Sequence, residues 1–338
     1  MSTHHLSRRA ALLGLPAAGF AAACQGGSAA TGDHRALTRD EERSLKTLRL
    51  IDAGHPLFAM TLYGPYDPLG KITSPPPATA FACSLFLAGA GPRGPLFGRN
   101  FDWRPSPALL LTTRPSNAPT SLSLVDISYL GIDQEAAKRL MGDARLQRSL
   151  LQAVRIPFDG MNEHGLAVGM AAVATADPPK VPGRQAVGSA RIQRLALDQA
   201  RTVDEAVAVF RRYNVEFEPG EVPLHYLLAD ARGKAAAIEF VDGELKVIPS
   251  AGGWHDLVNF VLSTADERER RADDRYRAIA DRMRRTGGSL DPAGAMDLLS
   301  EVAQGHTRWS AVYELRHGEL SLALGRDYRK IRRYKLAA

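Results

Sequence analysis

A cysteine followed by an arginine and an aspartate is the most reactive combination of side chains in this sequence. Cys83 is one of only two cysteines among 338 residues, and Arg99 and Asp102 follow it by 16 and 19 positions in the run GRNFD. A guanidinium beside a thiol favours the thiolate, the nucleophilic form, and Asp102 could hold the arginine or accept a proton from a nearby amine. The ordinary alternatives are a surface ion pair, worth about 0–1 kcal/mol, and a cysteine buried as a small apolar side chain.

Strand pairing would bring these residues together. The apolar segments on either side of residues 89–94 predict a hairpin in which Asn100 lies opposite Cys83. Arg99 and Asp102 would then be near neighbours of the thiol. Because they are three positions apart, an unbroken strand would put their side chains on opposite faces. A single site on one face therefore needs a bulge or the end of the strand.

The first 24 residues predict an export signal rather than part of the fold. The pair Arg8-Arg9 precedes the uncharged stretch 10–23, which is too short to span a bilayer. The pair resembles a twin-arginine signal, and Cys24 after three alanines resembles a lipobox cysteine that would carry a lipid. An ordinary cleaved secretory signal is the alternative. In each case we expect an exported protein, periplasmic or anchored to the cell envelope through Cys24, in which Cys83 has no disulfide partner.

The rest of the chain alternates short strands with helices. Amphipathic patterns predict helices over 41–54, 189–200, 203–213 and 266–285. Period-two patterns and turn residues predict strands over 56–64, 83–89, 95–103, 121–130, 164–173, 225–230, 235–240 and 244–249, and a hairpin over 310–324. Antiparallel connections between these strands favour an α+β fold with helices packed on sheets.

Composition and motifs exclude several classes of function. Lys and Arg number 43 against 37 Asp and Glu, so the net charge of +6 is mild, and the basic residues are scattered. We expect no nucleic-acid partner, because such proteins show a basic stripe and a recognisable reading module. The sequence has no HExxH, no paired CxxC and no glycine pattern typical of a nucleotide site, so it predicts neither a metal nor another cofactor.

Two motifs resemble the N-terminal-nucleophile linear amide hydrolases, the superfamily of choloylglycine hydrolases, acid-ceramidase-like amidases and isopenicillin-N acyltransferases. Cys83 and the run Gly98–Asp102 have the spacing found there, and DGMNEHGLAVGM (Asp159–Met170) resembles a second shared block. Weaker similarities surround Asn259, Arg275 and the segment 309–315. The resemblance implies a four-layer αββα sandwich with antiparallel sheets.

The resemblance also explains why no base is encoded near Cys83. Without it, His225 and His255 would be the candidates to approach the thiol in space. In such enzymes the chain cuts itself before the nucleophile, here between Ala82 and Cys83. The α-amino group so created titrates at about 7.7–8.0 and can act as the base. Residues 25–82 would then be a tether and a pro-segment or small chain, and 83–338 the catalytic domain.

Roles follow from the family pattern. Cys83 attacks the carbonyl of a small N-acyl amide and forms a thioester, and its amine passes the proton to the leaving nitrogen. The resemblance implies that Asp102 positions this amine and that Arg99 lies against the thiol and substrate. It implies that Asn259 donates to the oxyanion, an interaction worth about 3–4 kcal/mol, and that Arg275 steadies the active centre.

Alternatives remain at two of these positions and for the activity. Arg268 and Arg271 compete with Arg275 for its role. Where relatives often place a side-chain donor in the oxyanion hole, this chain has Ala172, whose backbone N–H alone could donate. The same thioester would serve an acyltransferase that passes the acyl group to an amine instead of water. A lipoprotein that binds an acylated ligand without catalysis is the third interpretation.

Overall fold

The computed structural model describes residues 35–70, 72, 82–217 and 221–336. The chain divides into two units, residues 1–37 and 38–338, and the elements below all belong to the second. The predicted export signal, including Cys24, lies outside the described residues. No helix in the described part of the chain is both long and apolar enough to cross a membrane.

The larger sheet of the described residues has nine strands. In spatial order they are β1 (Arg49–Asp52), β2 (Leu57–Tyr63), β5 (Ala108–Arg114), β6 (Ser121–Asp126), β7 (Asp159–Asn162), β8 (Ala167–Ala172), β11 (Leu224–Ala229), β12 (Ala235–Val241) and β13 (Glu244–Pro249). Neighbouring strands are antiparallel, except that β2 and β5 are parallel. The predicted antiparallel sheet therefore has one parallel pair, through which residues 57–63 join the strands that follow Cys83 in the chain.

The second sheet carries Cys83. Its strands are, in spatial order, β14 (Trp254–Leu257), β3 (Ala82–Ala88), β4 (Leu96–Asp102), β15 (Thr307–Glu314), β16 (Glu319–Leu324) and β17 (Arg332–Lys335), all antiparallel. A separate parallel pair is formed by β9 (Ala186–Gly188) and β10 (Asn214–Glu216). The hairpin predicted over 310–324 is present as β15 and β16, and β17 extends the sheet beyond it.

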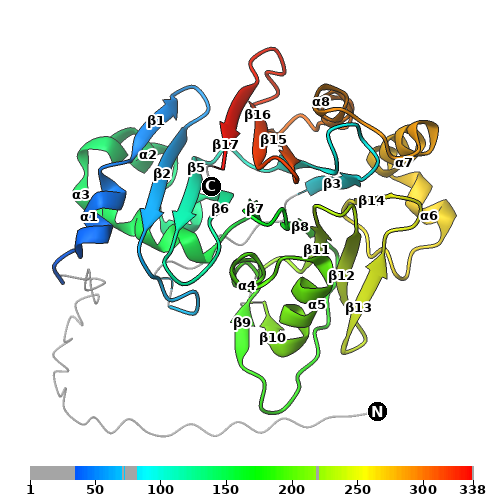
Figure 1. Ribbon diagram of the computed structural model, residues 1–338, viewed down its shortest axis with the longest axis horizontal. Coiled ribbons are helices and arrows are strands. Elements are labelled where there is room, and N and C mark those ends of the chain that lie inside the picture. The colour runs from blue at the N-terminus through cyan, green and yellow to red at the C-terminus, as the bar shows by residue number, and fades with distance from the viewer. Residues whose placement is uncertain (1–34, 71, 73–81, 218–220, 337–338) are drawn as a thin grey trace, which may run out of the picture. The chain divides into compact units, whose positions relative to one another are not determined.

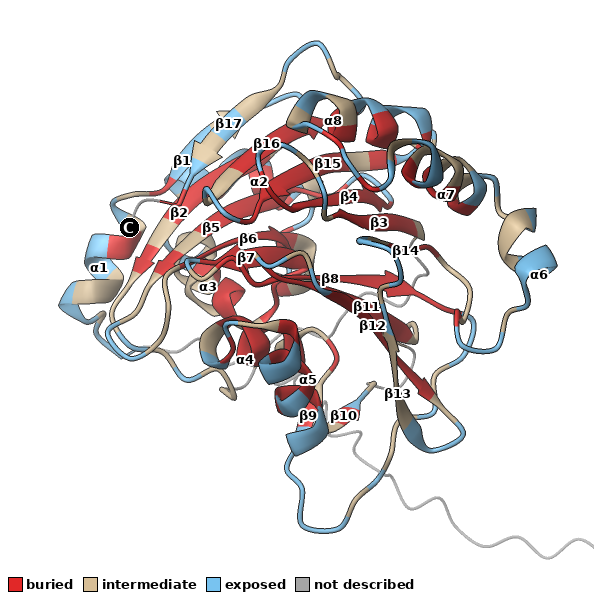
Figure 2. Cartoon of the chain, turned by 45° about the vertical axis from the view of Figure 1, so that its right-hand side comes forward, coloured by how far each residue is buried: buried red, intermediate tan, exposed pale blue. Residues whose placement is uncertain are grey.

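Helices cover both outer faces of the stacked sheets (Figures 1 and 2). On the six-stranded sheet, α7 (Asp274–Thr286) packs on β14 and β3, and α8 (Pro292–Glu301) packs on β4 and β15. On the nine-stranded sheet, α4 (Arg191–Gln199) packs on β7 and β8, and α5 (Val203–Arg212) packs on β11 and β12. The remaining helical segments are α1 (Arg39–Leu45), α2 (Gln134–Arg139), α3 (Ala144–Ser149), α6 (Glu267–Ala272) and the 3-10 turns η1 (Ile127–Leu130), η2 (Leu140–Gly142) and η3 (Leu150–Arg155). The four layers confirm the predicted αββα sandwich.

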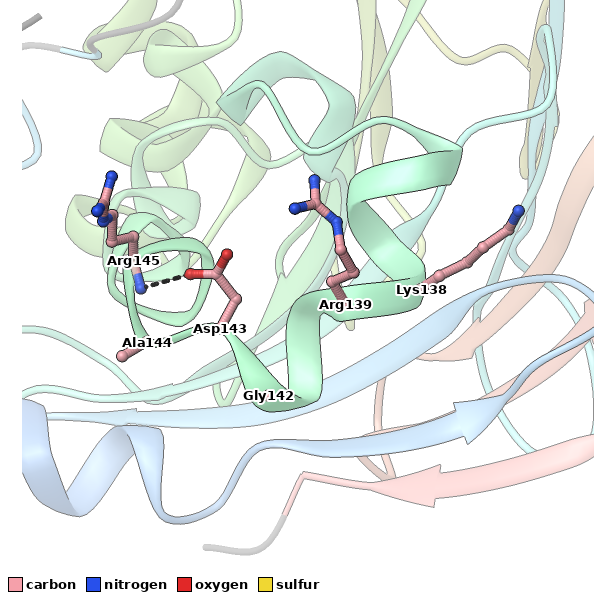
Figure 3. Close-up of a pocket in the computed structure, with 6 residues that line it drawn as sticks. All are labelled: Lys138, Arg139, Gly142, Asp143, Ala144 and Arg145. Carbon is pink, nitrogen blue, oxygen red and sulfur yellow. Dashed lines mark hydrogen bonds between the residues drawn. The ribbon is translucent and has the colours of Figure 1, made fainter.

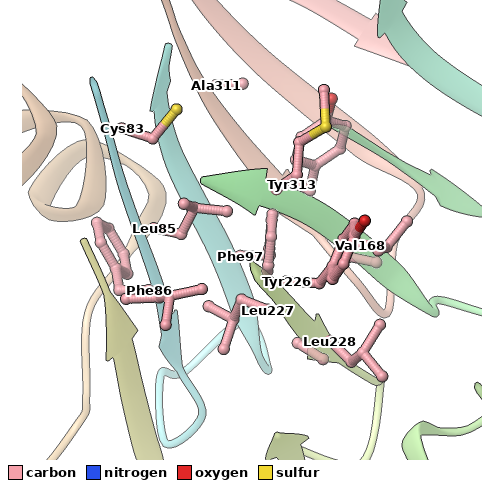
Figure 4. Close-up of a cluster of buried hydrophobic side chains, with 14 of the residues drawn as sticks. Cys83, Leu85, Phe86, Phe97, Val168, Tyr226, Leu227, Leu228, Ala311 and Tyr313 are labelled. Carbon is pink, nitrogen blue, oxygen red and sulfur yellow. The ribbon is translucent and has the colours of Figure 1, made fainter. Parts of the chain in front are cut away.

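The two sheets approach closely beside Cys83. Figure 4 shows Cys83 and Leu85 pointing from β3 to the same side, toward Val168 of β8, while Phe86 points away. Gly169 of β8 allows this approach, because a Cβ added there would lie 2.6 Å from the Leu85 side chain. Contact this close between the layers fixes the position of β3, and with it that of Cys83.

Two predicted helices differ from the structure. The segment predicted as a helix over 41–54 is helical only through Leu45, and residues 49–52 form β1 because pairing with β2 overrides their helical propensity. The helix predicted over 266–285 is two helices, α6 and α7, separated at Asp273. Asp273 has extended backbone and its carboxylate accepts from the first backbone N–H groups of α7, so it starts a new helix.

Candidate active site

Cys83 is the second residue of β3 and lies near the N-terminal end of that strand. Its partner on β4 is Phe101, whereas the predicted partner Asn100 pairs with Ser84. The prediction was wrong by one residue because the loop between the strands runs from 89 to 95, one residue longer than the turn assumed from the sequence. Since paired residues share a face of the sheet, Cys83 shares its face with Phe101 and Arg99.

Arg99 approaches the thiol from this face. Its Nη2 donates to Cys83 Sγ over 3.2 Å, and its Nη1 donates over 2.6 Å to both the Phe158 carbonyl oxygen and Asp159 Oδ2. Arg99 and Cys83 are both fully buried. Burial raises the pKa of the Cys83 thiol to about 11, and the Arg99 charge opposes that rise only in part. In the intact chain the thiol is therefore held protonated against a guanidinium that would stabilise the thiolate.

Asp159 was missed as a site residue by sequence reasoning. Its carboxylate is fully buried and takes hydrogen bonds from Arg99, from Trp309 Nε1 at 3.1 Å and from the Tyr313 hydroxyl. Because Asp159 belongs to β7, its pairing with Arg99 of β4 connects the two sheets. The signal was present: Asp159 is the first residue of the second motif, and both aromatic donors lie within the segment 309–315.

Asn259 contacts the backbone of Cys83. It lies two residues beyond Leu257, the last residue of β14, which pairs with Leu85, so it falls level with Cys83. The Cys83 N–H donates to Asn259 Oδ1 over 2.9 Å, and Asn259 Nδ2 donates to the Ala172 carbonyl oxygen over 2.8 Å. The amide nitrogen predicted to serve the oxyanion thus already lies between β8 and the nucleophile.

Arg275 is the arginine that the structure places at the site. Its Nη1 donates to the Cys83 carbonyl oxygen at 2.9 Å and to Asn259 Oδ1 at 2.8 Å, while Nη2 donates to Asp273 Oδ2 at 2.8 Å. The break before α7 is what directs it there, because Asp273 both caps the helix and holds the guanidinium. Of its competitors, Arg271 instead pairs with Asp281 near the surface.

Asp102 lies on the opposite face of β4 from Arg99, as the spacing predicted for an unbroken strand. Its Oδ1 accepts from Thr307, and its Oδ2 lies 3.9 Å from Arg275 Nη1 and accepts no hydrogen bond from the described residues. Burial raises its pKa, although Thr307 and Arg275 oppose that rise. β4 pairs with β3 without a bulge, so Arg99 and Asp102 stay on opposite faces of the sheet beside Cys83.

The two histidines considered as bases have other partners. His225 Nδ1 lies 2.9 Å from Glu239 Oε1, and its Nε2 lies 2.7 Å from the Val258 carbonyl oxygen. His255 Nε2 lies 2.9 Å from the Ile248 carbonyl oxygen, and its Nδ1 accepts from the Asp256 N–H. Both ring nitrogens of each histidine are therefore engaged away from the thiol.

Other features of the described residues lie apart from this site. They contain no group of three or more His, Cys, Asp or Glu side chains that could hold a metal ion. An open depression at α2, η2 and α3 is lined by Lys138, Arg139 and residues 142–145, and Figure 3 shows the basic side chains directed outward around it. None of the five predicted site residues lines this depression.

Known proteins resemble the chain mainly in fold. Residues 152–259 match the family model of acyl-coenzyme A:6-aminopenicillanic acid acyl-transferase. No curated protein matches the chain in sequence. Two variants of the conjugated bile acid hydrolase of Clostridium perfringens each match with a TM-score of 0.54, cover 75% of this chain and 92% of theirs, and are 16% and 14% identical. The penicillin V acylase of Agrobacterium tumefaciens covers 76% of this chain and 92% of its own at 16% identity, with a TM-score of 0.47.

The acyltransferase match covers β7, β8 and the strands up to Asn259, and thus includes the second motif. The hydrolase structures share the layered fold over three quarters of the chain. The family model that matches residues 152–259 and the fold shared with the bile acid hydrolase structures both support the resemblance of this chain to the N-terminal-nucleophile linear amide hydrolases.

Proposed function

We propose that the chain is a self-processing cysteine amidase whose nucleophile and base both belong to Cys83. One observation carries this proposal: three different side chains hold the three functional atoms of this residue. Arg99 donates to the thiol, Asn259 accepts from the backbone nitrogen, and Arg275 donates to the carbonyl oxygen. A cysteine buried only for packing would also need partners for its N–H and C=O, but it would not need a buried guanidinium against its thiol.

Hydrolysis of the Ala82–Cys83 peptide bond would consume one water and leave a carboxylate on Ala82 and an amine on Cys83. The nitrogen that now donates a single hydrogen bond to Asn259 would then carry further donors. The unused Oδ2 of Asp102 is a ready acceptor, because Asp102 pairs with Ala82 across the strands. This supports the role of Asp102 in positioning the amine.

Catalysis would use the processed residue. The Cys83 thiol gives its proton to its own amine while sulfur attacks the amide carbonyl, and the amine passes that proton to the leaving nitrogen. The products of this step are a thioester on Cys83 and a free amine. Water then attacks the thioester, releases the carboxylic acid and restores the thiol. The Asn259 amide group, held beside the Cys83 nitrogen, is the side-chain donor we assign to the oxyanion of both tetrahedral intermediates.

Acyl transfer is the second candidate, and the family match supports it. The matched model describes an enzyme that moves an acyl group from coenzyme A to 6-aminopenicillanic acid. Such a reaction shares the Cys83 thioester and differs in the acceptor, an amine in place of water. The fold relatives act on conjugated bile acids, so an amide with an apolar acyl group is the substrate class we propose.

We also propose that the protein is exported. The proposal rests on the paired arginines, the uncharged stretch 10–23 and Cys24 of the leader. Attachment to a membrane through a lipid on Cys24 would follow if the lipobox is used.

Trapping the thioester tests the proposed activity. Purified protein is incubated with a panel of N-acyl amides, including a conjugated bile acid, in the presence of hydroxylamine. We expect a hydroxamate of the acyl group and, on rapid quenching, a mass increase on the peptide that begins at Cys83. The Cys83→Ala variant is the control and should give neither. Adding 6-aminopenicillanic acid with an acyl-coenzyme A distinguishes transfer from hydrolysis. A processed wild type that binds acylated ligands without ever loading Cys83 would instead support the binding lipoprotein.

A further inference from the structure

A buried histidine–glutamate pair lies beneath the segment that carries Asn259. His225 of β11 and Glu239 of β12 are level with each other across the two strands, and His225 Nδ1 lies 2.9 Å from Glu239 Oε1. The two side chains are 1% and 2% exposed. An interior pair of this kind contributes little net stability compared with apolar residues of the same size. The backbone that the pair holds in place therefore explains its presence better than stability does.

The pair holds one short stretch of backbone at three points. His225 Nε2 donates to the Val258 carbonyl oxygen over 2.7 Å. Glu239 accepts from the Leu262 N–H at 2.6 Å and from the Ser263 N–H at 2.8 Å. These contacts flank Asn259 on both sides, one directly before it and two shortly after it.

The hydrogen bonds favour an ionised Glu239. Burial raises the pKa of its carboxyl, but the hydrogen bond and charge of His225 and the Ser263 contacts outweigh burial and bring the pKa below its usual 4.5. Because the Val258 carbonyl oxygen can only accept, His225 Nε2 carries the hydrogen of that contact. The imidazole therefore lies between Val258 and the Glu239 carboxylate and joins the two.

We propose that His225 and Glu239 are positioning residues that hold segment 258–263 so that Asn259 meets the Cys83 nitrogen and the Ala172 carbonyl. The inference rests on the proposed function for its catalytic consequence. Without the pair, the Asn259 side chain would still be present, but the backbone that orients it would no longer be held in place. Neither His225 nor Glu239 then needs to touch the substrate.

The test compares His225→Leu and Glu239→Gln with His255→Leu. His255 is a matched control, because it is also buried and also bonds a backbone carbonyl, but its ring nitrogens bond to the Ile248 carbonyl oxygen and the Asp256 N–H and not to residues 258–263. For the first two variants we expect kcat to fall tenfold or more, up to the 10²–10³-fold loss typical of a missing oxyanion donor, with KM changed less than about threefold. His225→Gln, whose amide can still donate to Val258 O, should recover part of kcat. In an Asn259→Ala background, His225→Leu should have little further effect.

Hydrogen exchange gives a readout that needs no turnover. Peptides spanning residues 258–263 should exchange faster in His225→Leu and Glu239→Gln than in wild type and His255→Leu. Unchanged exchange there, or losses of kcat that multiply in the Asn259→Ala background, would overturn the inference. If wild type turns over no amide while the exchange rates differ as expected, the proposed function fails and the positioning of the segment stands.

Discussion

The carboxyl of Asp256 gives a sharp prediction about stability and pH. Asp256 lies on β14, opposite Phe86 of the strand that carries Cys83, and is 4% exposed. Its Oδ2 accepts no hydrogen bond from the described residues. Burial raises its pKa from 3.8 to about 7, although the charges of Arg284 and Arg270 oppose that rise. The folded protein therefore holds a proton on Asp256 that the unfolded chain loses at lower pH.

The sign and size of the effect follow from this difference. Because the folded pKa is the higher one, the contribution of Asp256 to stability is complete below pH 3.8 and is lost as pH rises through about 7. At about 1.4 kcal/mol per pH unit, a difference of roughly three units corresponds to about 4 kcal/mol. Asp256→Asn removes the titration. Relative to wild type, its free energy of unfolding should rise by about 4 kcal/mol between pH 4 and pH 8.

Urea unfolding of both proteins at several pH values measures this difference. Asp297→Asn is the matched control, since Asp297 is exposed on α8 and its substitution should stay within about 0.5 kcal/mol at every pH. A constant offset between wild type and Asp256→Asn from pH 4 to pH 8 would refute the reasoning. Such a result would mean that water or a conformational change solvates the carboxylate in the folded state.

Three further substitutions test the site. Asp159→Asn leaves the buried Arg99 charge without its carboxylate partner and should lower the free energy of unfolding, measured in urea, by about 3–5 kcal/mol. Adding Arg99→Met should restore part of that free energy. A double variant less stable than Asp159→Asn would contradict the pairing. Arg275→Met should slow both processing and turnover at least tenfold in mass and rate assays, whereas Arg271→Met, which removes only a surface pair, should change neither. Asp102→Asn should lower kcat about 100-fold or more without lowering the free energy of unfolding at pH 8, because burial disfavours the charge of the carboxylate. If the variant lost stability together with activity, Asp102 would be a structural residue instead.

The local motifs allowed much of the site to be predicted. The spacing of Cys83, Arg99 and Asp102 depends on a single hairpin, which a sequence shows well. Its register was wrong by one residue, because the length of a loop rich in glycine and proline is hard to fix from residue types. The placement of Asn259 and Arg275 depended on family resemblance, and the structure brings both to the Cys83 backbone.

The rest of the site depends on tertiary contacts. Asp159 meets Arg99 only because two different sheets stack, and His225 meets Glu239 only because β11 and β12 pair in one particular register. The break at Asp273 was hidden by the many helix-forming residues around it, although an aspartate at a helix start is a recognised cap. It matters because it directs the side chain of Arg275.

The N-terminal sequence of the active protein tests the central claim most directly. Purified wild type should contain two polypeptides, and one of them should begin with Cys-Ser-Leu-Phe, the sequence from residue 83. The Cys83→Ala variant, prepared in the same way, should remain a single chain across residue 82. Active enzyme in which residue 83 is still joined to Ala82 would contradict the account, because the cysteine would then have no amine to act as its base.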